Sequence, residues 1–191
     1  MLFRSIIILD GSSLSATATG DNAGIRVHHT DGLSIYGQAL GTGWLSARGS
    51  GKGAGIGGNG GKAGDDWVSG GDGGSCGTVK IVSGKVTASS VGGGEGGNGT
   101  ASAAGGGNGG MGGKVTVYGG SLTVTGIIGG GNGGNSVYKY GGEGMVGGTL
   151  TVTRVGGRGT EILVELPLDR PVGPAAFVTT AGRHTSEEIG R

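Results

Sequence analysis

The sequence predicts an all-β chain, in which short strands form the coils of a parallel solenoid and glycine-rich arms of polyproline II type pack together as a bundle. Three observations lead to this expectation. Glycine accounts for 54 of the 191 residues and proline for only 3. Glycine pairs recur between side-chain-bearing residues at every third position, and β-type segments return at a nearly constant spacing. Such repeats are typical of solenoids and arrays.

The N-terminal quarter of the chain reads as plain β-structure. Runs rich in Ile, Val, Ser and Thr predict strands at 5–9, 13–19, 24–27, 33–36 and 43–47. Asp10, Asp21 and Asp31 stand in the turns between these runs, and local hydrogen bonding of their carboxylates is expected there. Short strands that lead into a stack of repeats favour the coils of a parallel β-helix over a sandwich, although periodicity alone separates the two weakly.

Tracts of the form x-Gly-Gly follow. In the clearest tract the side-chain-bearing positions are Ser69, Asp72, Ser75 and Thr78, and the positions between them are glycine except for Cys76. Three residues per turn is the period of a polyproline II helix, which has no internal hydrogen bonds and must find backbone partners elsewhere. Two glycines per turn let neighbouring backbones approach closely. Collagen is excluded, because it has one glycine per triplet and abundant proline.

Strands of a second period connect these tracts. Segments 78–82, 114–118 and 149–153 begin 36 and then 35 residues apart, and the first two lead through a glycine turn into further strand-like runs at 83–88 and 119–125. Apolar and polar residues alternate. Val115, Val117, Leu122 and Val124 are expected on one face, with Lys114, Thr116, Thr123 and Thr125 on the other. A flexible low-complexity chain is disfavoured because charged residues make up only 14% of the sequence.

Each glycine-rich excursion is expected to consist of an outgoing arm, a short tip and a returning arm. The tips are predicted at 65–68, 100–104 and 136–139. At about 3.1 Å per residue, an arm of nine or ten residues projects roughly 30 Å. Stacking the repeats lays about six arms side by side, outgoing against returning, which would satisfy their backbone amides.

The repeat style resembles a known family. The tract GAGIGGNGG at 53–61 and the run GGMGGKVTVYGGSLTVTG at 109–126 look like the glycine-rich β-helix repeats of bacterial cell-surface proteins of the carbohydrate-binding-domain type. The resemblance covers roughly residues 5 to 155. It implies a right-handed parallel β-helix, an extracellular or cell-surface location, a polysaccharide or cell-surface glycan as partner, and membership of a larger surface protein. It carries no catalytic motif.

The domain organisation is predicted from a change in composition. Residues 1–158 are expected to form the β-solenoid with its glycine-rich repeats, and 159–191 a C-terminal strand and extension of a truncated chain. A strand is expected at 161–166, ahead of the three prolines. The N-terminus lacks the charged, apolar and small-residue regions of a signal peptide, and no apolar run of about 18 residues predicts a membrane span.

The tips hold the best candidate binding residues. Trp67 is expected at the first tip and Tyr138 and Tyr140 at the third, close to the charged residues Asp65, Asp66 and Lys139. Aromatic faces beside polar groups provide the stacking and hydrogen bonding that sugars require. The competing interpretation is that these aromatic residues merely close the ends of the glycine arms.

Several chemistries receive little support. Residues 53–58 match G-x-G-x-x-G only as chance allows in a glycine-rich chain, without a βαβ unit. His28 and His29 are adjacent and are expected on opposite faces of a strand. The acidic residues near the first tip, among them Asp72, lack the spacing of calcium repeats. A net charge of +1 with scattered basic residues disfavours nucleic acid. The single cysteine excludes an intramolecular disulfide.

We therefore expect a module without catalytic activity, cofactor or bound metal, which serves a structural and polysaccharide-adhesive role. A passive stalk without a ligand is the main alternative. Two fainter alternatives are a polysaccharide lyase-like β-helix, which would need clustered carboxylates or basic residues on one sheet, and an ice-binding β-helix, which would need a flat Thr or Ala face.

Overall fold

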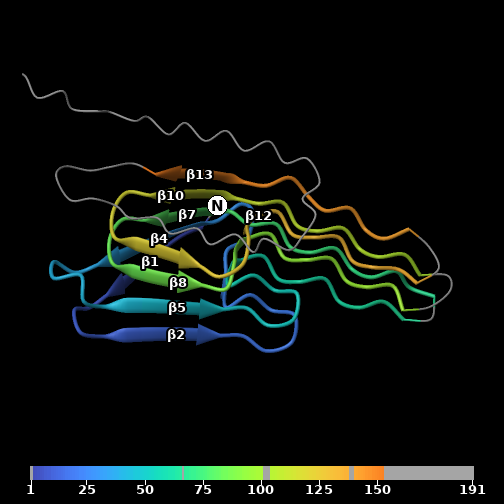
Figure 1. Ribbon diagram of the computed structural model, residues 1–191, viewed down its shortest axis with the longest axis horizontal. Coiled ribbons are helices and arrows are strands. Elements are labelled where there is room, and N and C mark those ends of the chain that lie inside the picture. The colour runs from blue at the N-terminus through green and yellow to red at the C-terminus, as the bar shows by residue number, and fades with distance from the viewer. Residues whose placement is uncertain (1, 66, 101–103, 138–139, 153–191) are drawn as a thin grey trace, which may run out of the picture.

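The computed structural model describes residues 2–65, 67–100, 104–137 and 140–152. Over these ranges the chain is all-β, with no helix, and its strands form three parallel sheets (Figure 1). Sheet A has the order β1-β4-β7-β10-β13, sheet B the order β11-β8-β5-β2 and sheet C the order β12-β9-β6-β3. Consecutive strands thus belong to successive sheets, and every third strand returns to the same sheet.

The strands of sheets A and B are four to six residues long, and those of sheet C have two residues. Sheet A comprises β1 (Phe3–Ile8), β4 (Gly32–Gly37), β7 (Thr78–Ile81), β10 (Lys114–Val117) and β13 (Thr149–Val152). Sheet B comprises β2 (Ser13–Thr17), β5 (Trp44–Arg48), β8 (Lys85–Ala88) and β11 (Ser121–Val124). Sheet C comprises β3 (Ile25–Arg26), β6 (Ile56–Gly57), β9 (Val91–Gly92) and β12 (Ile128–Gly129).

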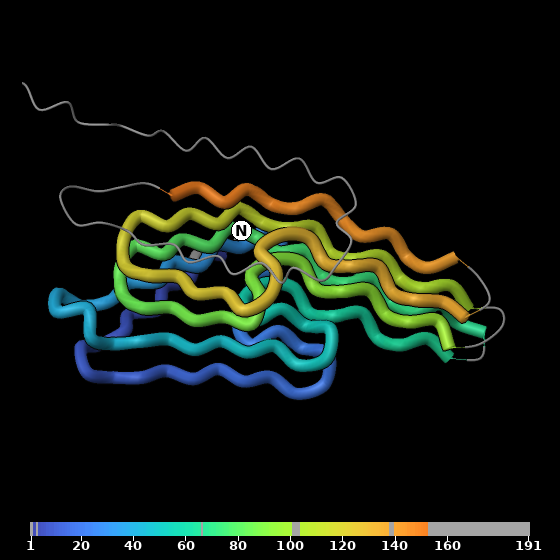
Figure 2. Tube along the Cα trace, viewed as in Figure 1, coloured from blue at the N-terminus to red at the C-terminus, as the bar shows by residue number. Residues whose placement is uncertain are grey.

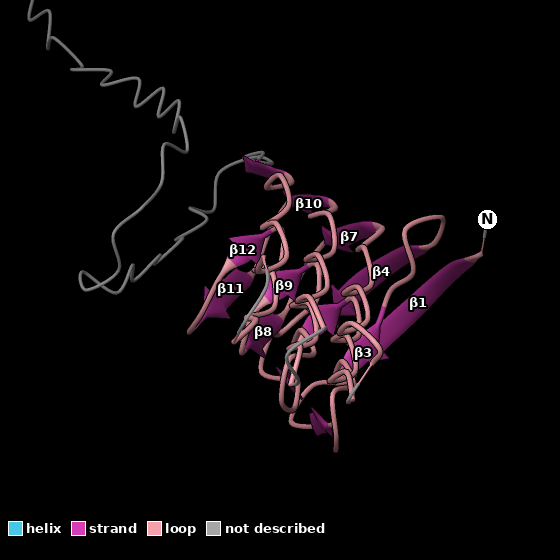
Figure 3. Ribbon diagram, turned by 90° about the vertical axis from the view of Figure 1, so that its right-hand side faces the viewer, coloured by secondary structure: helices cyan, strands magenta, loops and turns pink. Residues whose placement is uncertain are grey.

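The three strands β1–β3 form one repeat, and β4–β6, β7–β9 and β10–β12 form three more. Neighbouring repeats are in register, so that equivalent residues lie one above another. Leu33 pairs with Val79, and Val79 with Val115. In sheet B, Leu45 pairs with Val86, which pairs with Leu122. Figure 3 shows the resulting row of β1, β4, β7 and β10.

The hydrophobic core lies between the three sheets. It is built from stacked apolar side chains, because alternate residues of each strand point inward. The fully buried members include Ile35, Val79 and Ile81 from sheet A, Leu45 and Val86 from sheet B, and Ile56 and Val91 from sheet C. Each buried Val, Leu or Ile contributes about 1.5–3 kcal/mol relative to exposure, so the core stabilises the stack without a globular interior.

The predicted alternation is confirmed with one exception. Val115, Val117, Leu122 and Val124 are buried, and Lys114, Thr123 and Thr125 are exposed. Thr116, expected on the polar face, is buried.

The predicted strands of sheets A and B are present, with bounds that differ by at most two residues. Of sheet C, only β3 was predicted, within the strand expected at 24–27, whereas the segments of β6, β9 and β12 were expected to be only the starts of glycine arms. These strands consist of one aliphatic residue and one further residue, too short for any period to be visible. Their glycines Gly57, Gly92 and Gly129 have φ of 141°, 150° and 152°, a backbone region that side-chain-bearing residues rarely adopt.

The glycine arms extend from sheet C and run side by side (Figures 1 and 2). Outgoing arms 1, 2 and 3 are residues 58–64, 93–99 and 130–135, and returning arms 1, 2 and 3 are residues 70–77, 105–113 and 141–148. Their backbone bonds recur at every third residue: the amides of Gly93, Gly96 and Gly99 donate to the carbonyls of Gly129, Asn132 and Asn135. This is the period expected of polyproline II-type arms.

The arms form two hydrogen-bonded layers. Outgoing arms bond to parallel outgoing neighbours, and returning arms to parallel returning neighbours, as when Gly73 N donates to Asn108 O at 2.8 Å. Antiparallel bonds then join the layers, as when Gly97 N donates to Gly71 O at 2.8 Å. The expected contact of outgoing with returning arms is therefore accompanied by parallel contacts that the sequence did not reveal.

Candidate binding surface at the arm tips

The far ends of the arms are held in place by hydrogen bonds between neighbouring repeats. We define the arm tips by their described residues: 65, 67–69, 100, 104, 136, 137 and 140. Thr100 Oγ1 donates to Gly64 O at 2.7 Å, and Ser136 Oγ donates to Ala104 O at 2.8 Å. Because these bonds cross from one repeat to the next, the three tips form one surface.

Two aromatic side chains project from this surface. Trp67 is 82% exposed and Tyr140 is 93% exposed, although large aromatic side chains are usually well covered. At these exposed fractions, most of the surface of each ring is open to solvent. Both rings are therefore available to a partner.

The start of the second returning arm contacts residues of the first and third tips. Gly105 N donates to Ser69 Oγ at 3.1 Å, two residues after Trp67. A Cβ atom on Gly105 would lie 3.5 Å from Ser69 Oγ and also 3.5 Å from the backbone oxygen of Tyr140. The fold thus brings Ser69 of the first tip and Tyr140 of the third tip close to one glycine, Gly105.

Two further apolar residues of the tips were missed by the sequence reasoning. Val68 is 60% exposed and Val137 is 69% exposed. Their signal in the sequence is an apolar residue in a short segment between two glycine arms, where no core is near. Together with Trp67 and Tyr140 they give the tips an apolar character, and exposed apolar patches often mark interaction sites.

The remaining predicted site residues are only partly covered by the structure. Asp65 is exposed, and its carboxylate lies in the same tip segment as Trp67. Asp66, Tyr138 and Lys139 lie outside the described residues. The described part of the predicted site therefore consists of Asp65, Trp67 and Tyr140.

The three turn aspartates bond differently from the expectation. Asp10 accepts from the amides of Leu40 and Thr42 at 3.1 and 3.3 Å, Asp21 from the amide of Lys52 at 3.1 Å, and Asp31 from the amide of Leu2 at 3.2 Å. These contacts join residues 29 to 32 positions apart. The predicted local bonding is found for Asp31, which also accepts from Thr30 Oγ1 at 3.4 Å, and not for the Asp10 and Asp21 carboxylates in the described residues. Stacking places the amides of a neighbouring repeat within reach, the next one for Asp10 and Asp21 and the preceding one for Asp31, so the carboxylates connect repeats.

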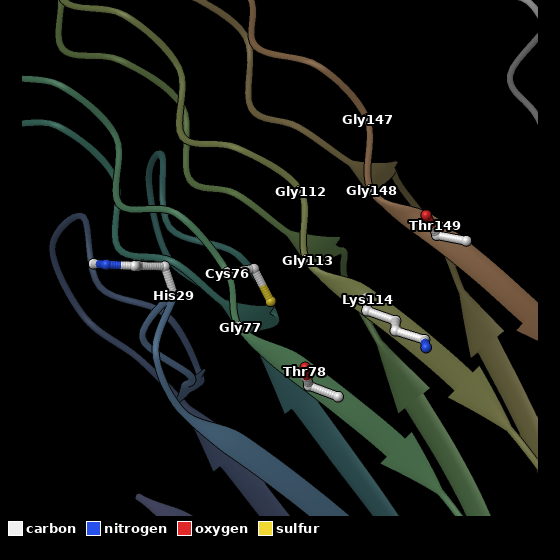
Figure 4. Close-up of a pocket in the computed structure, with 10 residues that line it drawn as sticks. All are labelled: His29, Cys76, Gly77, Thr78, Gly112, Gly113, Lys114, Gly147, Gly148 and Thr149. Atoms are coloured by element: carbon white, nitrogen blue, oxygen red, sulfur yellow. The ribbon is translucent and has the colours of Figure 1, made fainter. Parts of the chain in front are cut away.

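A small cavity of about 330 Å³ lies where the returning arms enter sheet A, lined by residues that include Cys76, Lys114 and His29 (Figure 4). The His29 ring points away from the Cys76 thiol in this view. Burial raises the pKa of the Cys76 thiol to about 11, against the weaker opposing effect of backbone hydrogen bonds from Gly113 and Gly77. A protonated, buried thiol is a poor nucleophile.

Cys76 belongs to the hydrophobic core and is not merely a small residue tolerated between arms. Its backbone forms a bridge with His28, because the first repeat sends out no glycine arm at this position. The equivalent Gly112 has no such space, since a Cβ there would lie 2.3 Å from Gly148 N.

The rings of His28 and His29 lie next to each other and do not point to opposite faces of a strand. The ring centroids of His28 and His29 are 4.1 Å apart, which contradicts the expectation that they point to opposite faces of a strand. The strand β3 ends at Arg26, and a turn begins at His29, so alternation does not apply. Within the described ranges, no three His, Cys, Asp or Glu side chains gather as metal ligands do.

Comparisons with known proteins give no match, either to a protein-family model, to a curated protein or to a solved structure. Among the described segments there is no helix with the length and apolarity of a membrane span.

Proposed function

We propose that this chain is an extracellular structural and adhesive module of a bacterial surface protein, which binds polysaccharide through the arm tips without catalysing a reaction. We further propose that the three sheets close into a right-handed parallel β-helix that carries the arms. The observation that carries the functional proposal is the exposure of Trp67 and Tyr140, at 82% and 93%, on one surface.

Sugar rings bind proteins by stacking their C–H faces on aromatic rings, while polar groups at the edge take up the hydroxyls. The tips provide exposed rings, the Asp65 carboxylate and the Thr100 hydroxyl in one region. A rigid support also favours binding, because little conformational entropy is lost when the site is already ordered. The hydrogen bonds between arms supply this support.

The proposal is tested by retention on a panel of immobilised neutral and acidic polysaccharides, with and without calcium. The double variant Trp67→Ala/Tyr140→Ala removes both rings. We expect the wild-type protein to be retained on at least one polysaccharide, and the double variant to bind it at least tenfold more weakly, because about 1.4 kcal/mol of stacking energy corresponds to a factor of ten.

Trp44→Ala is the matched control, since Trp44 is 45% exposed on sheet B, away from the arms. It should bind as the wild type does. Retention that survives the double substitution would move the site to a sheet surface. Absence of retention on every polysaccharide would contradict the adhesive role and leave a passive stalk.

A further inference from the structure

A second cavity lies at the bases of the arms, at the opposite end from the tips. Its volume is about 760 Å³, within the usual range of ligand pockets. We call it the corner groove. Its lining comes from the connection between β5 and β6, from the corners that follow β8 and β11, and from outgoing arms 2 and 3.

The three connections between sheet B and sheet C that border this groove differ in length. The connection from β5 to β6 covers residues 49–55, whereas β8 and β9 are joined only by Ser89 and Ser90, and β11 and β12 by 125–127. The longer loop reaches the arms, since Glu95 N donates to Lys52 O at 2.9 Å. The hollow is thus bounded by this loop and by the two shorter corners.

The groove is rich in hydrogen-bond donors. Ser89 Oγ and Ser90 Oγ each accept a backbone amide, from Gly49 and Gly55 respectively, at 3.1 Å. Neither hydroxyl hydrogen has an acceptor among the described residues, so both are available to donate into the groove. Arg48 is exposed and makes no ion pair with another described residue.

The remaining lining groups are fixed in position. Lys52 Nζ donates to Gly96 O and, at 2.6 Å, to Asn98 Oδ1, which uses two of its three hydrogens. Glu95 Oε1 accepts from Asn132 Nδ2 at 3.1 Å. Ile127, which is 46% exposed, supplies an apolar side chain.

We propose that the corner groove binds a carboxylated sugar unit of a polysaccharide, as a site separate from the arm tips. The Arg48 guanidinium pairs with the sugar carboxylate, because its planar fork matches a carboxylate. Ser89 and Ser90 donate to ring oxygens, Glu95 accepts from ring hydroxyls, and Ile127 contacts the apolar face of the ring. A simple anion would use the cations but not Glu95 or Ile127.

The probe is trigalacturonate, and its fully methyl-esterified form is the matched neutral ligand. Titration calorimetry on the full chain should show binding of the acid that weakens at least tenfold on esterification and at least tenfold in Arg48→Ala. Arg48→Lys should recover part of the loss, since it keeps the charge without the fork. Lys85→Ala removes an exposed cation of sheet B that does not line the groove, and it should bind as the wild type does.

Three outcomes would overturn the inference: no binding of trigalacturonate, equal losses in Arg48→Ala and Lys85→Ala, or equal competition by inorganic sulfate, which would indicate general anion attraction. Equal thermal midpoints of the variants exclude misfolding as the cause of any loss. The double variant Trp67→Ala/Tyr140→Ala should retain trigalacturonate binding in the groove, which separates failure of this site from failure of the tips.

Discussion

At the scale of single residues, the arms depend on the absence of side chains at particular positions. A Cβ atom on Gly97 would lie 1.8 Å from Lys62 O and 2.5 Å from the Lys62 carbonyl carbon. These are backbone atoms in a hydrogen-bonded layer, so they cannot move aside as a flexible side chain would. By contrast, a Cβ on Gly147 meets nothing within 4 Å. Glycine is therefore needed for packing at the first position and not at the second.

Gly97→Ala should destabilise the protein by about 3 kcal/mol or more, at the upper end of overpacking effects, because whole arms must separate. Gly147→Ala should be neutral or stabilise by up to about 1 kcal/mol, since alanine restricts the unfolded chain. Denaturant unfolding of both variants measures the difference. Equal stability of the two would mean that the arms are more loosely packed than the structure indicates.

The Cys76 thiol predicts a dependence of stability on alkaline pH. Its pKa is raised to about 11 in the folded protein, whereas an unfolded thiol has a pKa of about 8.5. The folded state therefore holds the proton more tightly. The resulting stabilisation is complete below pH 8.5 and is lost as the pH rises through 11.

Unfolding free energies of the wild type and of Cys76→Ala, measured from pH 7.5 to 11, should converge as the pH rises, because only the wild type loses this contribution. Other groups titrate in both proteins and cancel in the difference. A parallel pH dependence of the two proteins would contradict the burial of the thiol. Slow reaction with a thiol reagent in the folded state would support it independently.

At the scale of elements, the side-chain-bearing residues of the triplets complete the hydrogen bonding of the arms. Asp72 Oδ1 accepts from Asn108 N at 2.7 Å, and Asn108 Oδ1 accepts from Glu143 N at 2.9 Å. Ser75 Oγ accepts from Met111 N at 3.0 Å in the same way. Polar side chains at these positions thus accept hydrogen bonds from backbone amides of the neighbouring arm. We call these contacts caps.

Asn108→Ala should cost about 1 kcal/mol, because the Glu143 amide loses its acceptor. Asn108→Asp keeps an acceptor but places a carboxylate between Asp72 and Glu143, so its cost should fall with added salt. Thermal unfolding at low and high salt distinguishes these effects. Met111→Ala is the control, since this 54% exposed side chain accepts no hydrogen bond from a described residue, and it should change stability by less than about 0.5 kcal/mol.

The elements differ in how far the sequence reveals them. Alternation of apolar residues predicts the strands of sheets A and B, since inward positions must be apolar. The triplet period predicts the arms. In sheet C, β3 lies within the strand predicted at 24–27, but β6, β9 and β12 were missed, because a two-residue strand has no measurable period. The caps were also missed. The repeat spacing of 36 and 35 residues is visible in the sequence, but it does not indicate that a side chain of one arm reaches a backbone amide of the next.

At the scale of the whole molecule, the strands and the arms are two solutions to one requirement, the pairing of backbone groups between repeats. The tips could be anticipated from the sequence, because they interrupt the glycine tracts and contain aromatic residues. The corner groove could not, because it is formed by three connections of unequal length, and their lengths become visible only once sheet C is known. The exposed fractions of the aromatic side chains also required the structure, because Trp67 and Trp44 are the same residue type but are 82% and 45% exposed.

The threefold hydrogen-bond period of the arms constrains how their length can change. Inserting or deleting one residue turns every later position by about 120°, which directs a side chain into the space that Gly97 must leave empty. Length changes are therefore tolerated only in whole triplets. A triplet added to one arm alone would also extend past its neighbours and lose their caps. Lengthening the bundle thus requires triplets to be added at matching positions in adjacent repeats. The distance by which the tips project from the sheets can therefore increase only by whole triplets, and only in several arms at once.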